Sequence, residues 1–193
     1  SIRFLQKMSS VLEKMKKTWN IIILDVCCHD TMFSRSMQGP DSQTSFLERW
    51  KIQPKTRNVT RSTLDSTSQE FPRYNESYTG KPYRYAYTIS ASLENGDGPK
   101  ESRNCIIKHD LENNSRLVRE LQSYQYPGEF VFVPTKDGKH EDDGWLMGFV
   151  IDSKSETTDF VIFAGQALLQ EPVASVRIPH IIPYGFHGNW CPN

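Results

Sequence analysis

Residues 83–89 read Tyr-Arg-Tyr-Ala-Tyr-Thr-Ile, an alternation of aromatic residues with small or polar ones. Successive side chains of a β-strand point to opposite faces, so this period of two predicts a strand with one apolar face. Segments of similar strand character follow it along the chain, at residues 105–109, 116–122, 130–134, 145–151, 159–164 and 173–178. Turn signals such as Asp137-Gly138 and Asp143-Gly144 separate several of them.

Before residue 83 the strand signals are sparser. Residues 21–28 form a β-branched apolar run that predicts a buried strand, and residues 47–52 predict a short one. The rest of the stretch 34–70 is polar and is expected to form long loops. Many short strands at fairly even spacing predict an all-β sandwich, barrel or propeller, and periodicity alone does not choose among the three.

The one segment with helical spacing is residues 3–19. Its apolar residues are Phe4, Leu5, Met8, Val11, Leu12, Met15 and Trp19. Lysine and arginine occupy most of the other face. Such a basic amphipathic helix either covers a domain core or lies on a membrane surface, so peripheral membrane contact is left open.

Composition excludes several classes of function. The chain has 193 residues with 23 basic and 23 acidic side chains, so its formal net charge is zero and no nucleic-acid partner is expected. No run of about 18 apolar residues occurs, and no secretory leader is recognised at the start. The four cysteines show no Cys-x-x-Cys spacing, which favours reduced thiols in a cytoplasmic protein.

The C-terminal segment 179–190 is rich in constrained residues. His187 stands between Gly185 and Gly188, with Phe186 and Trp190 as apolar neighbours. This setting is typical of a histidine presented to a buried site, although a histidine that merely packs at the end of a strand would look similar. The other four histidines are expected to be structural or in solvent: His29 and His140 exposed, His109 structural, and His180 in a loop.

Two glutamates stand in apolar surroundings, where a carboxylate is costly unless it is paired. Glu70 precedes Phe71, and Glu129 precedes a run of apolar residues at 130–134. A buried carboxylate commonly accepts a hydrogen bond from a metal-bound imidazole. A glutamate facing solvent at a strand edge is the alternative for each. Neither a phosphate-binding loop nor a nucleophile elbow is present.

Several motifs, in order, resemble the C-terminal part of the carotenoid cleavage oxygenases, a family of carotenoid and lignostilbene dioxygenases. The motifs are residues 24–27, 47–50, 64–65, 70–73, 80–87, 127–134, 141–145 and 183–190. The resemblance covers residues 20–193 and leaves residues 1–19 outside it as a separate helical segment. We therefore expect a fragment of a longer protein.

This resemblance implies part of a seven-bladed β-propeller, about three to four blades, with a short N-terminal helix. It also implies an Fe(II) ion held by four histidines. The implied reaction is oxidative cleavage by O2 of a C=C bond in a lipophilic polyene or stilbenoid, which yields two carbonyl products. Carotenoids, apocarotenoids and stilbenoids are the implied substrates.

Matched residue by residue, His187 corresponds to the last iron ligand, and Glu70 and Glu129 to glutamates that orient ligand histidines. Glu129 is expected to pair with His187. The other three ligands have no counterpart, which leaves Glu70 without the histidine that it would orient. The chain alone is therefore expected to lack catalytic iron and activity, and to need the missing N-terminal propeller part. An iron-free half-propeller that binds lipophilic polyenes or a protein partner is the alternative.

Overall fold

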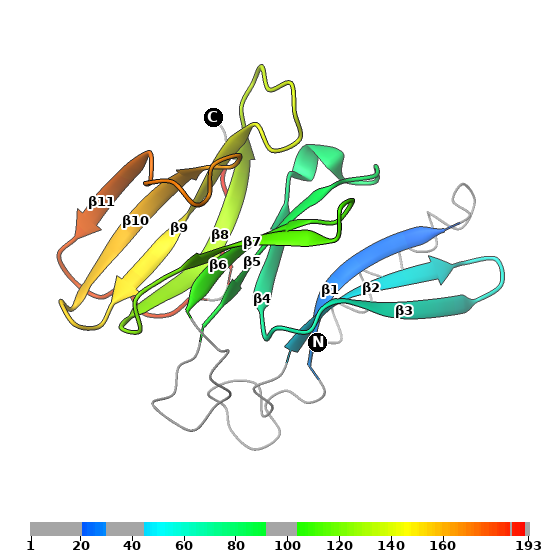
Figure 1. The fold of residues 1–193 in the computed structure, drawn as a ribbon, viewed down its shortest axis with the longest axis horizontal. Coiled ribbons are helices and arrows are strands. Elements are labelled where there is room, and N and C mark those ends of the chain that lie inside the picture. The colour runs from blue at the N-terminus through cyan, green and yellow to red at the C-terminus, as the bar shows by residue number, and fades with distance from the viewer. Residues whose placement is uncertain (1–20, 30–44, 92–103, 186, 192–193) are drawn as a thin grey trace.

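The computed structural model describes residues 21–29, 45–91, 104–185 and 187–191. In these residues the regular structure is eleven β-strands and one short 3-10 turn, η1 (Glu76–Tyr78). The strands form three antiparallel sheets that follow one another along the chain (Figure 1). The predicted helix at residues 3–19 lies outside the described residues. No described helix is long and apolar enough to cross a membrane.

Each sheet is a meander, in which strands that are consecutive in sequence are neighbours in space. The strands of the first sheet are β1 (Ile22–His29), β2 (Ser45–Gln53) and β3 (Asn58–Asp65). Those of the second sheet are β4 (Glu70–Tyr74), β5 (Tyr85–Ser90), β6 (Cys105–Asp110) and β7 (Ser115–Glu120). Those of the third sheet are β8 (Gln125–Pro134), β9 (Gly144–Asp152), β10 (Thr157–Ala164) and β11 (Ala174–Ile178).

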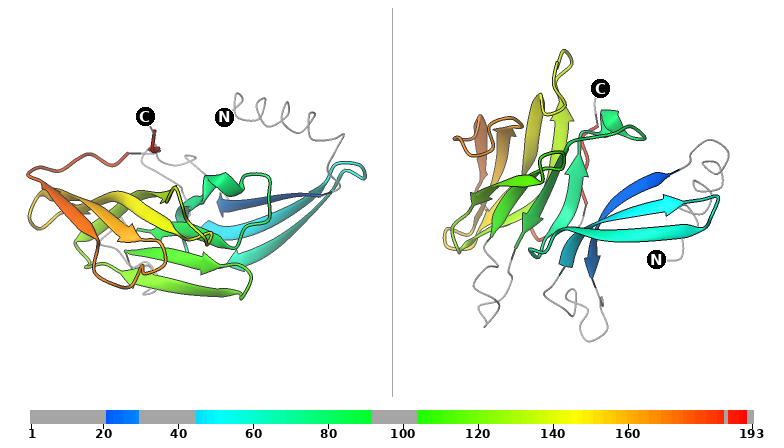
Figure 2. Two further views of the ribbon diagram at one scale, coloured as in Figure 1. Left: turned by 90° about the horizontal axis from the view of Figure 1, so that it is seen from above. Right: turned by 45° about the vertical axis from the view of Figure 1, so that its right-hand side comes forward.

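The edge strands β4 and β8 bring the second and third sheets together. β8 contacts β4 and β5, and β1 of the first sheet contacts β4 from the other side. Two views from other directions show the three sheets following one another from β1–β3 to β8–β11 (Figure 2). One short strand, β4, therefore stands where all three sheets meet.

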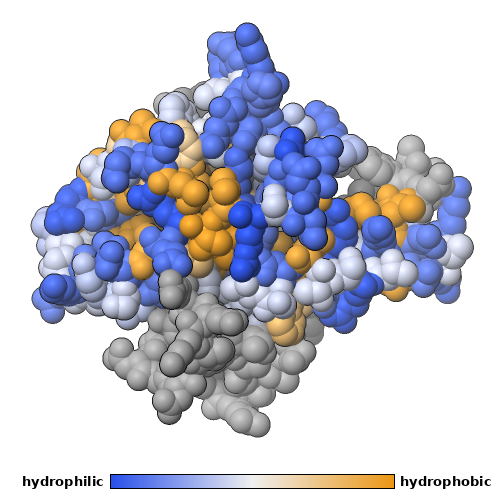
Figure 3. Space-filling model, in the orientation of Figure 1, coloured by the Kyte–Doolittle hydropathy of each residue, from blue (hydrophilic) through white to orange (hydrophobic). Residues whose placement is uncertain are grey.

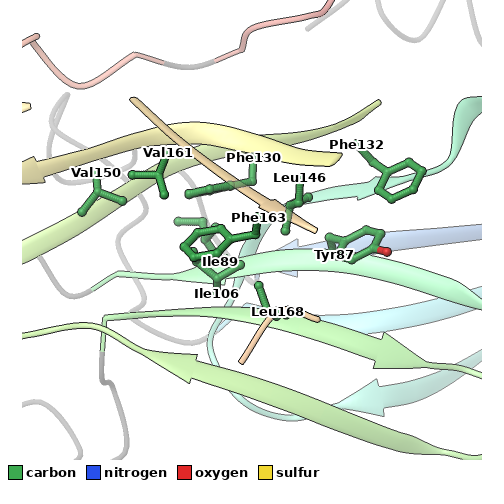
Figure 4. Close-up of a cluster of buried hydrophobic side chains, with 10 residues drawn as sticks. All are labelled: Tyr87, Ile89, Ile106, Phe130, Phe132, Leu146, Val150, Val161, Phe163 and Leu168. Carbon is green, nitrogen blue, oxygen red and sulfur yellow. The ribbon is translucent and has the colours of Figure 1, made fainter. Parts of the chain in front are cut away.

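The main core lies between the second and third sheets (Figure 4). Its buried side chains are Tyr87, Ile89, Ile106, Phe130, Phe132, Leu146, Val150, Val161, Phe163 and Leu168. Tyr87 of β5 stacks on Phe132 of β8, with ring centroids 5.2 Å apart. Each buried side chain of this size contributes about 1.5–3 kcal/mol by removal of apolar area from water. Hydrophobic residues also gather on the surface over the middle of the molecule and over β1 (Figure 3), where Ile23 is exposed.

The turn between β8 and β9 ties the same two sheets together through its acidic residues. The carboxylate of Glu141 accepts hydrogen bonds from the backbone N–H groups of Arg84 and Tyr85 at 2.7–2.9 Å. Buried Lys108 donates to Asp142 Oδ2 at 2.6 Å and to the Gly165 carbonyl at 2.8 Å. These bonds satisfy buried charges that would otherwise be costly. Two residues of the motif at 141–145 thus have a structural role.

All nine predicted strands are confirmed, and the other two strands, β3 and β4, were not predicted. The stretch 34–70 was expected to be loops around one short strand, which is wrong for β3 and for the start of β4. Residues 58–63 of β3 are exposed on both faces, so the strand has no apolar alternation by which it could be found. The all-β class is confirmed in the described residues.

Burial on β8 and β9 predicts unequal costs for two similar substitutions. Phe130 is 2% exposed in the core, whereas Phe149 is 40% exposed on the opposite face of the third sheet. We expect Phe130→Ala to lower the free energy of unfolding by about 3–5 kcal/mol because it leaves a cavity. Phe149→Ala should cost no more than about 1 kcal/mol. Urea denaturation followed by circular dichroism measures both, and equal losses would contradict this placement of the core.

Candidate functional site

The sequence Glu70-Phe71-Pro72-Arg73 at the start of β4 forms the centre of the candidate site. The pairing of β4 with β5 is irregular between Glu70 and Arg73, and Phe71 has a φ of 52°. A left-handed backbone at a residue other than glycine costs about 1–3 kcal/mol. Pro72 has no backbone N–H and so cannot donate a hydrogen bond to the neighbouring strand. An irregularity of this kind re-aims side chains, and Glu70, Phe71 and Arg73 all reach groups in other parts of the chain.

Glu129 of β8 binds the C-terminal segment. Its Oε1 accepts a hydrogen bond from His187 Nδ1 at 3.2 Å, and its Oε2 accepts one from the Gly188 N–H at 2.7 Å. Arg73 Nε also donates to Oε1, at 2.8 Å. The Glu129 side chain is 7% exposed, whereas that of His187 is 72% exposed. The predicted pairing of Glu129 with His187 is confirmed.

The charge of Glu129 determines which nitrogen of His187 is open. Burial alone would raise the pKa of Glu129, but the hydrogen bonds from Arg73, Gly188 and His187 outweigh it and hold the pKa below its usual range. The carboxylate is therefore ionised at neutral pH and can only accept a hydrogen bond. In the neutral form of the His187 ring, Nδ1 is therefore the nitrogen that carries the proton, and the lone pair is on Nε2.

Glu70 has a histidine partner that the sequence did not predict. His29, the last residue of β1, forms a hydrogen bond through Nε2 with Glu70 Oε1. The His29 side chain is 6% exposed, so the expectation that it lies in solvent is wrong. The expectation that Glu70 lacks a histidine is wrong as well. Burial raises the pKa of Glu70, and the opposing effects of His29, the Phe71 N–H and His187 offset only part of that rise.

His29 leaves one nitrogen without a partner. Its Nδ1 is buried and has no hydrogen-bond partner among the described residues. The sequence prediction ended the strand at residue 28 and so placed His29 in solvent. The alternation of side chains along β1 could have placed His29 correctly, because a strand that continues by one residue puts His29 on the same face as Asp25 and Cys27.

Phe71 connects the two histidine–glutamate pairs along β4. The Phe71 ring meets the His187 ring edge-on, with centroids 5.6 Å apart and planes at 85°. Phe71 is also the residue next to Glu70. Among the described residues, the aromatic ring beside His187 thus comes from β4. Phe186 lies outside the described residues, and Trp190 is exposed.

The remaining histidines are not part of this cluster. His109 is buried and shares hydrogen bonds with Gln69 Oε1 at 2.8 Å and Thr88 Oγ1 at 3.1 Å. Burial lowers its pKa to about 4, so its ring is neutral at pH 7 and structural, as predicted. His140 and His180 are exposed, which confirms the prediction for His140.

The described residues do not by themselves fit an iron ion. No group of three or more histidine, cysteine, aspartate or glutamate side chains in the described part of the chain is placed to hold a metal. All five histidines of the sequence are described. His187 offers one open nitrogen, His29 and His109 are buried, and the other two are solvent-exposed loop residues.

Comparison with known proteins defines the class to which this fold and site belong. The family model for the retinal pigment epithelial membrane protein matches residues 13–192. The carotenoid cleavage oxygenase of Mycobacterium tuberculosis is 39% identical over 176 residues, which are 89% of this chain and 34% of that protein. The apocarotenoid-15,15'-oxygenase of Synechocystis is 31% identical over 177 residues, covering 88% of this chain and 36% of that protein.

Solved structures agree with the sequence relatives. A cobalt-substituted Synechocystis apocarotenoid oxygenase matches with a TM-score of 0.78 and 29% identity, over 90% of this chain and 37% of that chain. The chain belongs to the carotenoid cleavage oxygenase family, and it covers the C-terminal portion of these relatives. It spans about a third of their length. The structural neighbours are β-propeller enzymes, so the predicted propeller fragment is confirmed.

The buried, neutral His109 predicts a loss of stability in acid. Its pKa is about 4 in the folded chain and near 6.5 when unfolded, so the unfolded chain takes up the proton first as the pH falls. The free energy of unfolding should therefore decrease from pH 6.5 to pH 4, by up to about 3 kcal/mol from this residue.

Urea denaturation at pH 7 and at pH 4.5 measures this effect. His109→Gln should remove most of the difference between the two pH values, whereas His140→Gln, at an exposed position, should leave it unchanged. An unaltered pH dependence in His109→Gln would show that other groups cause the loss.

Proposed function

We propose that this chain supplies the C-terminal sheets of a non-haem Fe(II) dioxygenase. That enzyme would use O2 to cleave a C=C bond of a carotenoid, apocarotenoid or stilbenoid into two carbonyl products, with the chain inactive on its own. The observation that carries the proposal is the His187–Glu129 pair, since a buried carboxylate holds one nitrogen of an exposed imidazole and leaves the other free. The names of the relatives support the reaction class.

Within such an enzyme, the task of this chain would be to present His187. The ionised Glu129 keeps the proton on Nδ1 and the lone pair on Nε2, which is the form that binds a metal. Iron would supply the activation of O2. The described residues hold no group of three or more side chains that could bind a metal around His187, so the other ligands would have to come from a part of the protein that precedes this one.

An exposed apolar face on the third sheet supports contact with another part of the propeller. Phe149, Phe160 and Val176 lie opposite one another across β9, β10 and β11. Phe149 and Val176 are exposed, as is Trp145 further along β9. The opposite face of this sheet packs on the second sheet in the main core. A contiguous apolar face marks an interaction surface, and we assign it to the missing N-terminal propeller part.

The alternative is an iron-free half-propeller that binds lipophilic polyenes or a protein partner. The lack of a three-ligand metal group in the described residues favours it. The proposal includes two predictions from the sequence. The protein is expected in the cytoplasm, and residues 3–19 are expected to contact a membrane surface.

Iron loading of the chain, alone and with a family partner, tests the proposal. The partner would be the N-terminal part of the Mycobacterium tuberculosis relative that precedes the matched region, co-expressed with this chain. After anaerobic addition of Fe(II), elemental analysis should find no stoichiometric iron on the chain alone and about one iron per complex. The complex, but not the chain, should cleave an apocarotenoid.

Two variants identify the ligand. His187→Ala should abolish iron binding by the complex, whereas His180→Ala, at an exposed position, should leave it unchanged. A complex that forms but binds no iron would contradict the proposal and favour the iron-free alternative. Iron bound by the chain alone and retained in His187→Ala would also contradict it.

A further inference from the structure

The backbone of Gly188 is held at its N–H and at its carbonyl by two charged side chains. Its N–H donates to Glu129 Oε2 at 2.7 Å, and its carbonyl accepts from Arg73 Nη2 at 2.6 Å. Arg73 Nε donates to Glu129 Oε1 at 2.8 Å. The three groups therefore close a ring of hydrogen bonds immediately after His187. We call Arg73, Glu129 and Gly188 the Gly188 clasp.

Arg73 uses its guanidinium group differently from other arginines of the chain. In the Arg49–Asp25, Arg84–Asp110 and Arg177–Asp159 pairs, Nε and Nη2 donate to the two oxygens of one carboxylate. In the clasp the same two groups are divided between the Glu129 carboxylate and a backbone carbonyl. The rigid plane of the guanidinium group fixes the distance between these acceptors, which the single ammonium group of lysine cannot do.

The segment around His187 has few other described attachments. The described contacts that tie residues 187–191 to the sheets are those of Glu129 and Arg73 and the edge contact with Phe71. A Cβ built on Gly188 would meet no atom within 4 Å, so packing does not confine the backbone there. The Arg73 side chain is 17% exposed, and its bond to Glu129 is partly shielded from water, whereas its bond to the Gly188 carbonyl lies at the surface.

We propose that Arg73 is a positioning residue for His187. It holds Glu129 in the orientation that receives the His187 Nδ1–H, and it fixes the backbone of Gly188 so that the His187 ring is presented in one direction. The inference rests on the proposed function, in which His187 is the group delivered to the metal. A site group held by supporting residues must be placed within about 0.5 Å to act, and the clasp supplies that constraint.

Nuclear magnetic resonance of the 193-residue chain tests the role with two readouts. One is hydrogen exchange of the Gly188 amide, and the other is the tautomer of His187 from its ring 15N shifts. Arg73→Lys keeps the positive charge and removes the pair of planar N–H donors that binds Glu129 and Gly188 together. We expect exchange of the Gly188 amide to rise at least about tenfold, in line with the loss of one charge-assisted hydrogen bond. His187 should lose its preference for a protonated Nδ1.

Two control variants separate positioning from general effects. Glu76→Ala removes the exposed third bond of Arg73, from Nη1 to Glu76 Oε1 at 3.2 Å, and should change neither readout. Arg177→Lys makes the same chemical change at an ordinary arginine–carboxylate pair and should also change neither. If Arg73→Lys matches these controls in a folded chain, the proposal is wrong.

The unaltered chain offers a test that does not depend on the folding of a variant. The Arg73 Nε–H should exchange slowly and show a cross-peak to the Gly188 region, and the Gly188 amide should be protected. Rapid exchange of both would overturn the proposal. These measurements need no iron, so a clasp that is present in a chain whose complex never binds iron would contradict only the proposed function.

Discussion

The packing of the second sheet on the third is the constraint on which the rest of the molecule depends. Within the third sheet, Gly148 and Gly165 make room for the rings of Phe130 and Phe132, since a Cβ on either glycine would lie 2.7 Å from its ring. Both rings belong to the core against the second sheet, where Phe132 stacks on Tyr87 of β5, and β8 contacts both β4 and β5. Arg73 of β4 can therefore reach Glu129 of β8, and the candidate site follows from the core.

β4 connects this core to both histidines. Its backbone irregularity at Phe71 lets three nearly consecutive side chains serve different partners: Glu70 binds His29, Phe71 meets the His187 ring, and Arg73 binds Glu129. A regular strand would place alternate side chains on opposite faces of the sheet. The strained residue thus lies where the chain needs an arrangement that ordinary strand geometry does not provide, which is common at functional sites.

The sequence predicted those features that leave a periodic or motif signature. Alternating strands were found because burial on one face selects apolar residues, and the His187–Glu129 pair was found through resemblance to a family. β3 was not found because its residues 58–63 are exposed. The roles of His29 and Arg73 depend on where β1 ends and on the left-handed φ of Phe71, and neither the exact end of a strand nor such a backbone angle is visible in residue spacing.

The exposed strand β3 has a consequence for how the sequence can change over evolution. Where one face of a strand is buried, a shift of one residue moves every apolar side chain to the wrong side, so burial specifies the register. Residues 58–63 have no such burial, and the pairing of β3 with β2 is supported by the surface contact of Arg61 with Glu48. Substitutions, and even insertions near the β2–β3 turn, should therefore accumulate there without disturbing the cluster around β4, whose every side chain has an assigned neighbour in another sheet or segment.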